Sequence, residues 1–103
     1  MRNVFVMRSV AVVLTAMLLG AAANAYPGEK YASEAKITLE QAKAIALKTQ
    51  AGVVTAGELE REPGGSGLRY SFDITTGQVT HEVGVDAKTG AVLENSIEGP
   101  HAD

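Results

Sequence analysis

The chain has 103 residues, with twelve acidic side chains, nine basic ones and a formal net charge of −3. It contains no cysteine, which excludes disulfides and thiolate metal sites. The acidic balance argues against nucleic acid, and against an anionic membrane surface, as the partner.

Residues 1–25 have the pattern of a secretory signal peptide. A basic start is followed by an apolar run over residues 10–19 and then by an Ala-Asn-Ala triplet. We therefore expect cleavage between Ala25 and Tyr26. A retained membrane anchor is the alternative, but the run is short for a span, which takes roughly 20 residues. No cysteine is present for lipid attachment, and the two early arginines are not adjacent, as the twin-arginine route requires.

Cleavage at this site would leave 78 of the 103 residues, with seven basic and twelve acidic side chains and a formal charge of −5. A domain of this size buries only about 60% of the surface of its unfolded chain. We expect one thin core, in a periplasmic or secreted protein without a membrane contact after cleavage.

Residues 26–36 are expected to form a flexible leader, because Pro27 and Gly28 interrupt regular structure and no periodicity is visible. A helix is predicted to follow, because Thr38 and Gln41 have the spacing of a capping box. Gly52 stands where a left-handed helix stop is expected. The apolar stripe of this helix is rich in alanine and consists of Leu39, Ala42, Ile45, Ala46 and Thr49.

Strands are predicted over residues 53–62, 68–74, 79–86 and 91–97. Short connections between consecutive strands favour an antiparallel meander. The predicted fold class is therefore α+β, with one helix packed on a three- to four-stranded antiparallel sheet. Before the last strand, Asp86 can accept hydrogen bonds from the backbone that follows it, and Gly90 can take the left-handed conformation of a tight turn. Residues 98–103 are expected to be a disordered tail.

Carboxylates alternate along the first predicted strand. Glu58, Glu60 and Glu62 share one face, which Asp73 and Glu82 could join. One interpretation is a cation site or a surface for a basic partner, since hard cations prefer several oxygen ligands. The other is a solvated face that prevents edge-to-edge aggregation. We favour the second for an ion, because alternate carboxylates on a strand are too far apart to share one.

Two further residues carry open interpretations. Leu47 lies opposite the apolar stripe of the helix and is either a loosely packed surface residue or part of a contact patch. The candidate partner-binding surface therefore comprises Glu58, Glu60, Glu62 and Leu47. His81 shares its strand face with valines and has no recognisable nucleophile or metal partner beside it. We expect a histidine at the rim of the core, and its role stays open.

The chain resembles the PepSY domain family over roughly residues 37–95. The resemblance lies in the helix LEQAKAIAL at 39–47, the acidic strand ELERE at 58–62, the aromatic strand LRYSFDI at 68–74 and the segment VDAKTGAVL at 85–93. It implies one helix against an antiparallel sheet. It also implies a module found in propeptides of thermolysin-like metallopeptidases, where it is thought to hold the protease inactive, and in short exported proteins. No His-Glu-x-x-His motif occurs in the sequence, so any inhibition would act on a separate molecule.

We therefore expect a non-catalytic protein with no cofactor, no metal site and no catalytic residue. The leading hypothesis is a protein- or peptide-binding module that modulates an exported peptidase or another envelope protein. An open antiparallel sheet has edges to which an extended segment can add as a strand. The alternative is a small-molecule or metal-ion binding protein of the cell envelope, and an enzyme is the remote third hypothesis. The oligomeric state stays open.

Overall fold

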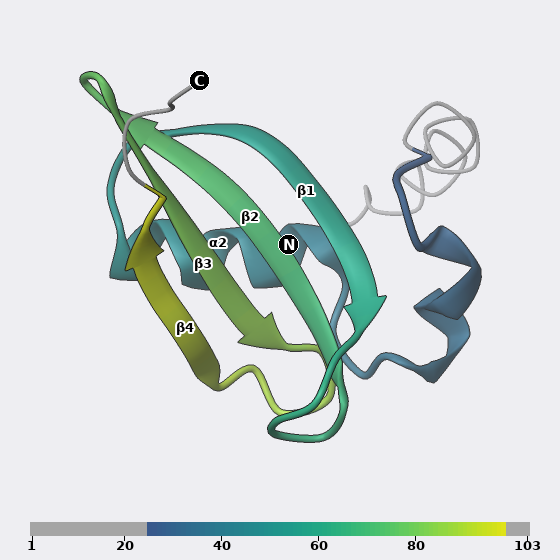
Figure 1. The fold of residues 1–103 in the computed structure, drawn as a ribbon. Helices are drawn as coiled ribbons and strands as arrows, with labels where there is room; N and C mark the ends of the chain where they lie inside the picture. The colour runs from purple at the N-terminus through teal and green to yellow at the C-terminus, as the bar shows by residue number, and fades with distance from the viewer. Residues whose placement is uncertain (1–24, 99–103) are drawn as a thin grey trace, which may run out of the picture.

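The computed structural model describes residues 25–98, which form two helical segments and one sheet (Figure 1). The predicted signal peptide, apart from Ala25, and residues 99–103 of the predicted tail lie outside the described residues. In chain order the elements are the 3₁₀ helix η1 (Glu29–Glu34), α2 (Leu39–Thr49), β1 (Val53–Arg61), β2 (Leu68–Thr76), β3 (Val79–Asp86) and β4 (Val92–Ile97).

The four strands form one antiparallel sheet in the order β1-β2-β3-β4, and α2 packs across one of its faces (Figure 1). The α+β fold expected from the sequence is therefore confirmed. The sheet is not closed, so β1 and β4 are edge strands. Within residues 25–98, no second layer of helices or strands covers the face away from α2 (Figure 1). Among residues 25–98, no helix is long and apolar enough to cross a membrane.

The helix α2 begins as its sequence predicts. The Thr38 hydroxyl accepts from the Gln41 N–H at 3.0 Å, and the Gln41 side chain accepts from the Thr38 N–H at 2.8 Å. This capping box pairs two amide groups that the first turn of a helix otherwise leaves free. Ala42 and Ala46 are fully buried, because their short side chains let α2 approach the sheet closely. The helix ends differently from the prediction, which placed a left-handed stop at Gly52. Its C-cap, Gln50, is extended, and Gly52 lies two residues further on with a φ of 153°.

The core lies between α2 and the sheet. Alternate residues of β2 face the helix, with Tyr70 and Phe72 stacked at a ring-centroid distance of 6.4 Å. Burying one such side chain contributes roughly 1.5–3 kcal/mol. The Tyr70 hydroxyl donates to the Ile37 carbonyl at 2.8 Å, so the core also positions the segment that enters α2. The other fully buried large apolar residues are Leu59, Leu68, Ile74, Val83 and Val85.

The segment predicted to be a flexible leader contains the 3₁₀ helix η1 and contacts the sheet. Residues 29–34 form η1, and the Pro27 carbonyl accepts a hydrogen bond from the Leu59 N–H on β1 at 2.9 Å. Gly28 has a φ of 85° and lies against the Leu59 carbonyl, where any Cβ would collide. Tyr31 packs partly against the core, and the Arg61 guanidinium lies 4.6 Å from the centroid of its ring. The sequence pattern did not reveal these contacts, because their partners lie about 30 residues further along the chain.

Candidate functional site

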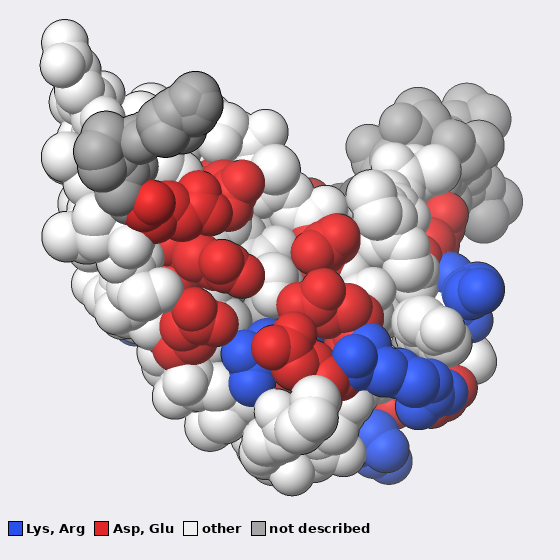
Figure 2. Space-filling model, in the orientation of Figure 1, with Lys and Arg blue, Asp and Glu red and all other residues white. Residues whose placement is uncertain are grey.

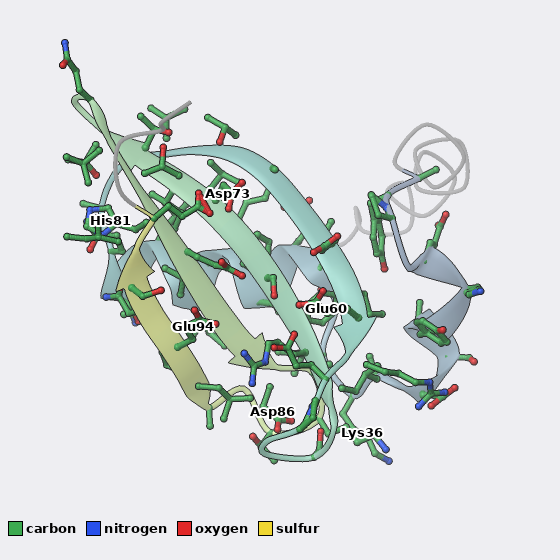
Figure 3. The ribbon with its side chains drawn as sticks, in the orientation of Figure 1. Lys36, Glu60, Asp73, His81, Asp86 and Glu94 are labelled. Atoms are coloured by element: carbon green, nitrogen blue, oxygen red, sulfur yellow. The ribbon has the colours of Figure 1, made fainter. Side chains whose placement is uncertain are left out.

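The face of the sheet away from α2 is strongly acidic (Figure 2). Strand pairing places Glu58 and Glu60 of β1 opposite Ser71 and Arg69 of β2, on the face opposite to the core residues. Asp73, Glu82 and Glu94 extend the same face across β2, β3 and β4. Figure 3 shows Glu60, Asp73 and Glu94 on three different strands. We call this surface the acidic face; it consists of Glu58, Glu60, Glu62, Asp73, Glu82, Glu94 and Glu98.

One cation, Arg69, lies within the acidic face. Its side chain is 9% exposed, and its Nη1 lies 3.2 Å from a carboxylate oxygen of Glu94 and 3.8 Å from one of Glu62. Its Nη2 donates to the Pro63 carbonyl at 3.3 Å. Among the described residues, the buried Nε of Arg69 finds no hydrogen-bond partner. Arg69 therefore neutralises the end of the face near the β1–β2 loop.

The other end of the acidic face is hollowed into a groove of about 320 Å³. Its lining includes four carboxylates, those of Glu58, Asp73, Glu82 and Glu98. None of the ion pairs found among the described residues involves any of them. Burial raises the pKa of the Glu82 carboxyl, and the charges of Glu94, Glu98, Asp73 and Glu60 raise it further. The groove is thus a site of uncompensated negative charge. We call it the acidic groove; its lining includes Glu58, Ser71, Asp73, Glu82 and Glu98.

The outer edge of β1 is the second feature of this region. The Leu59 N–H points away from β2, because it donates to Pro27. Backbone groups of a strand alternate between its two sides, so Gly57 also directs its N–H and carbonyl outward. Along Val53–Gly57, no backbone hydrogen bond among residues 25–98 joins this outer edge to another segment. A β-bulge at Thr55 interrupts the pairing with β2 in the same stretch.

A second groove, of about 350 Å³, lies on the opposite side of the same strand segment. We call it the helix-side groove; its lining includes Tyr26, Leu39, Lys43, Gly57 and Phe72. Gly57 opens it, because a Cβ at this position would lie 3.1 Å from the Phe72 ring. Ala56 and Gly57 line both grooves. The free part of the β1 edge is therefore bordered by one groove on each face of the sheet.

The turn between β3 and β4 is built around the Asp86 carboxylate, which is 1% exposed (Figure 3). Its Oδ1 accepts from the Lys88 and Thr89 amides at 2.8 and 3.0 Å, and from the Ser66 hydroxyl at 2.8 Å. Its Oδ2 accepts from the Ser66 amide at 2.6 Å. Burial alone would raise the pKa of this carboxyl, but the bonds from Ser66, Lys88 and Thr89 outweigh it and lower the pKa to about 2. Gly90 closes the turn with a φ of 81°.

The structure separates the members of the candidate surface chosen from the sequence. Glu58, Glu60 and Glu62 all belong to the acidic face, and the Glu60 carboxylate accepts from the Ser71 hydroxyl at 2.8 Å. Glu62 lies beyond the end of β1, beside Arg69. Leu47 lies on α2, on the other side of the sheet, where it packs partly against the core. The sequence prediction placed Leu47 opposite the apolar stripe, because a helical wheel of α2 alone does not show what the rest of the fold brings beside it.

The structure also places the remaining residues that the sequence analysis singled out. Ala25 and Tyr26 both line the helix-side groove, and Tyr26 packs partly against the core. His81 is half-buried on β3, where it pairs with Ile74 and Ile97. Among residues 25–98, no group of three or more His, Cys, Asp or Glu side chains is arranged to hold a metal ion.

Sequence reasoning missed Arg69, Glu94 and Glu98 as members of this region. Arg69 was recognisable, because it shares the polar face of its strand with Ser71 and Asp73. The positions of Glu94 and Glu98 depend on the register between β3 and β4, which includes a shift between Gly84 and Val85. No local pattern in the sequence predicts that shift.

Comparison with known proteins gives one match. The family model PepSY, described as "Peptidase propeptide and YPEB domain", matches residues 36–95. This range runs from the residue before Ile37 to the middle of β4, and it contains most of both grooves. No curated protein and no solved structure matches the chain significantly.

Proposed function

The chain belongs to the PepSY family, and from that membership we propose that it is an exported protein-binding module that lowers the activity of a separate peptidase. Domains of this family are often linked to peptidase propeptides or regulation, they are typically non-catalytic, and proteins that contain them are commonly exported. Because the chain resembles propeptides of thermolysin-like metallopeptidases, the partner that we propose is an exported metallopeptidase. Inhibition would then occur between two molecules.

The observation that carries this proposal is the free outer edge of β1 along Val53–Gly57. An extended segment of a partner can add to such an edge as a fifth strand, with main-chain hydrogen bonds supplying affinity. The edge already binds backbone, because Leu59 donates to the Pro27 carbonyl at its other end. A flexible loop near the active site of a peptidase could bind here in extended form and be held away from substrates.

The chemistry of the most perturbed carboxylate also supports a binding role over a catalytic one. Asp86 uses both carboxylate oxygens to hold the β3–β4 turn and the β1–β2 loop together. A carboxylate with a pKa of about 2 is a poor general base at neutral pH, since it gains little by accepting a proton. Its hydrogen bonds are those of a structural residue.

The test is inhibition measured with two separate proteins. Residues 26–103 are titrated into an exported thermolysin-like metallopeptidase from the same organism, and hydrolysis of a short fluorogenic peptide is followed at steady state. We expect saturable inhibition that is reversed on dilution. An unrelated acidic protein of similar size, at equal concentration, controls for a general effect of charge. Full peptidase activity at a hundredfold molar excess of the domain would contradict the proposal for that partner class.

A further inference from the structure

The free part of the β1 edge lies between two grooves of different chemistry. On one side, the helix-side groove is lined by Tyr26, Leu39 and Val54 above the buried Phe72 ring, with Glu40 and Lys43 of α2 also in its lining. On the other side, the acidic groove offers Glu58, Asp73, Glu82 and Glu98. Both grooves are lined by Ala56 and Gly57, so both can be reached by a segment that pairs with this stretch of β1.

Side chains of a β-strand point alternately to the two faces of its sheet. A strand added to β1 would therefore direct every second side chain toward the helix side and the others toward the acidic face. The free stretch of five residues spans about 17 Å, which accommodates two or three side chains on each face. The helix-side groove would then bind one set of alternate side chains, and the acidic groove would bind the other set.

Resting on the proposed function, we propose that the β1 edge selects an extended segment in which apolar residues alternate with lysine or arginine. The apolar side chains enter the helix-side groove beside Leu39 and Val54. The basic side chains enter the acidic groove, where they supply the positive charge that its four carboxylates lack among the described residues. The backbone of the segment pairs with the outward groups of Gly57 and its neighbours.

The charges also argue against a second copy of this chain as the occupant. The free stretch Val53–Gly57 contains no lysine or arginine, so the same stretch of a second molecule would bring no positive charge to the acidic groove. A basic segment would bring that charge, so charge complementarity favours a different protein.

The test uses four synthetic heptapeptides and fluorescence anisotropy with residues 26–103. The first peptide alternates lysine and valine, and the second alternates glutamate and valine. The third has the composition of the first, with its valines and lysines gathered in two blocks. The fourth is the first peptide with alternate backbone nitrogens methylated, which removes the N–H groups that pair with a strand edge.

We expect saturable binding of the alternating lysine peptide, and binding at least roughly tenfold weaker for the other three. The double variant Glu58→Gln, Glu98→Gln should weaken binding of the first peptide by about threefold or more, since each partly exposed ion pair contributes modestly. The control variant Glu29→Gln removes one carboxylate charge from η1, outside the lining of both grooves, and should leave binding of the first peptide unchanged. Raised salt should weaken binding of the first peptide as well.

Equal binding of the blocked or the N-methylated peptide would overturn this inference, because charge alone would then explain the affinity. Failure of all four peptides while the domain still inhibits the metallopeptidase would also overturn it. In that case the proposed function would stand and its contact would lie elsewhere. Failure of the peptides together with absence of inhibition would contradict both proposals.

Discussion

Ser66 and Asp86 join the two loops at one end of the sheet. The Ser66 amide donates to Asp86 Oδ2 at 2.6 Å, and the Ser66 hydroxyl donates to Asp86 Oδ1 at 2.8 Å. Asp86 also accepts from Lys88 and Thr89 in its own turn. One buried carboxylate therefore holds a local turn and a distant loop, and several measurable properties depend on it.

Replacement of Asp86 by asparagine should lower the free energy of unfolding by about 2–3 kcal/mol. The amide nitrogen of asparagine would face the Ser66 N–H, which would leave two buried donors opposed and a charge-assisted bond lost. Chemical denaturation measures the loss. The matched control is Asp73→Asn, which removes a carboxylate from the crowded acidic groove and should leave stability equal or slightly higher. Equal destabilisation by both variants would contradict a special role for the Asp86 network.

As the pH is lowered, the free energy of unfolding should first rise and then fall, because Glu82 and Asp86 have opposite effects. The pKa of Asp86 is lowered from 3.8 to about 2 by folding, so its contribution is present above pH 3.8 and is lost as the pH falls toward 2. The pKa of Glu82 is raised, so protonation of Glu82 favours the folded state. Its unfavourable contribution at neutral pH should fade as the pH falls toward 4.5.

Thermal melts between pH 7 and pH 2 test this pattern. Stability should rise modestly as the pH falls from 7 toward 4.5, where Glu82 gains its proton, and then fall steeply below pH 3.8. Glu82→Gln should flatten the rise, whereas Asp86→Asn should flatten the fall. A steady fall in stability from pH 7 downward would be inconsistent with the crowding of charge in the acidic groove.

Replacement of Gly90 by valine should destabilise the domain by about 1–3 kcal/mol. Gly90 has a φ of 81°, a conformation that strains a β-branched residue, and a Cβ there would lie 3.4 Å from Ile45 Cδ1. Gly90→Asn is the control, since asparagine tolerates the left-handed region better than other residues with side chains. The difference in melting temperature between the two variants isolates the backbone effect. Similar melting of the valine variant and the native protein would refute the left-handed assignment.

The exported protein should begin at Tyr26. Cleavage between Ala25 and Tyr26 would free an N-terminus at the rim of the helix-side groove, which both residues line. Intact mass and N-terminal sequencing of the protein recovered from the periplasm or medium check this prediction. Recovery of the full-length chain in the inner-membrane fraction would support the retained anchor instead.

Divalent ions should not bind the acidic face specifically. Calcium, zinc or copper titrated calorimetrically into residues 26–103 should give no saturable heat. A true site at a hundredfold excess of ion over its Kd would stabilise the fold by about 2.7 kcal/mol, which a melt would reveal. A saturable shift that Glu60→Gln abolishes would make metal binding the better explanation of the acidic face.

Much of the fold could be predicted because it depends on contacts between near neighbours in the chain. The bonds between Thr38 and Gln41 span three residues, as does the bond from Thr89 to Asp86. The alternation of Leu68, Tyr70, Phe72 and Ile74 is visible without any knowledge of the partner strands. The sequence by itself therefore determined the helix, the strands, the β3–β4 turn and the acidic character of one strand face.

The tertiary structure decided which of these elements form a site. The hydrogen bond from Leu59 to Pro27 spans 32 residues, and the ion pair of Arg69 with Glu94 spans 25. These contacts depend on sheet register, a β-bulge at Thr55 and the path of the chain before α2. Each follows from the packing of the whole domain, because many weak long-range contacts are optimised together. The same packing places the acidic groove and the helix-side groove on the two sides of one free strand edge.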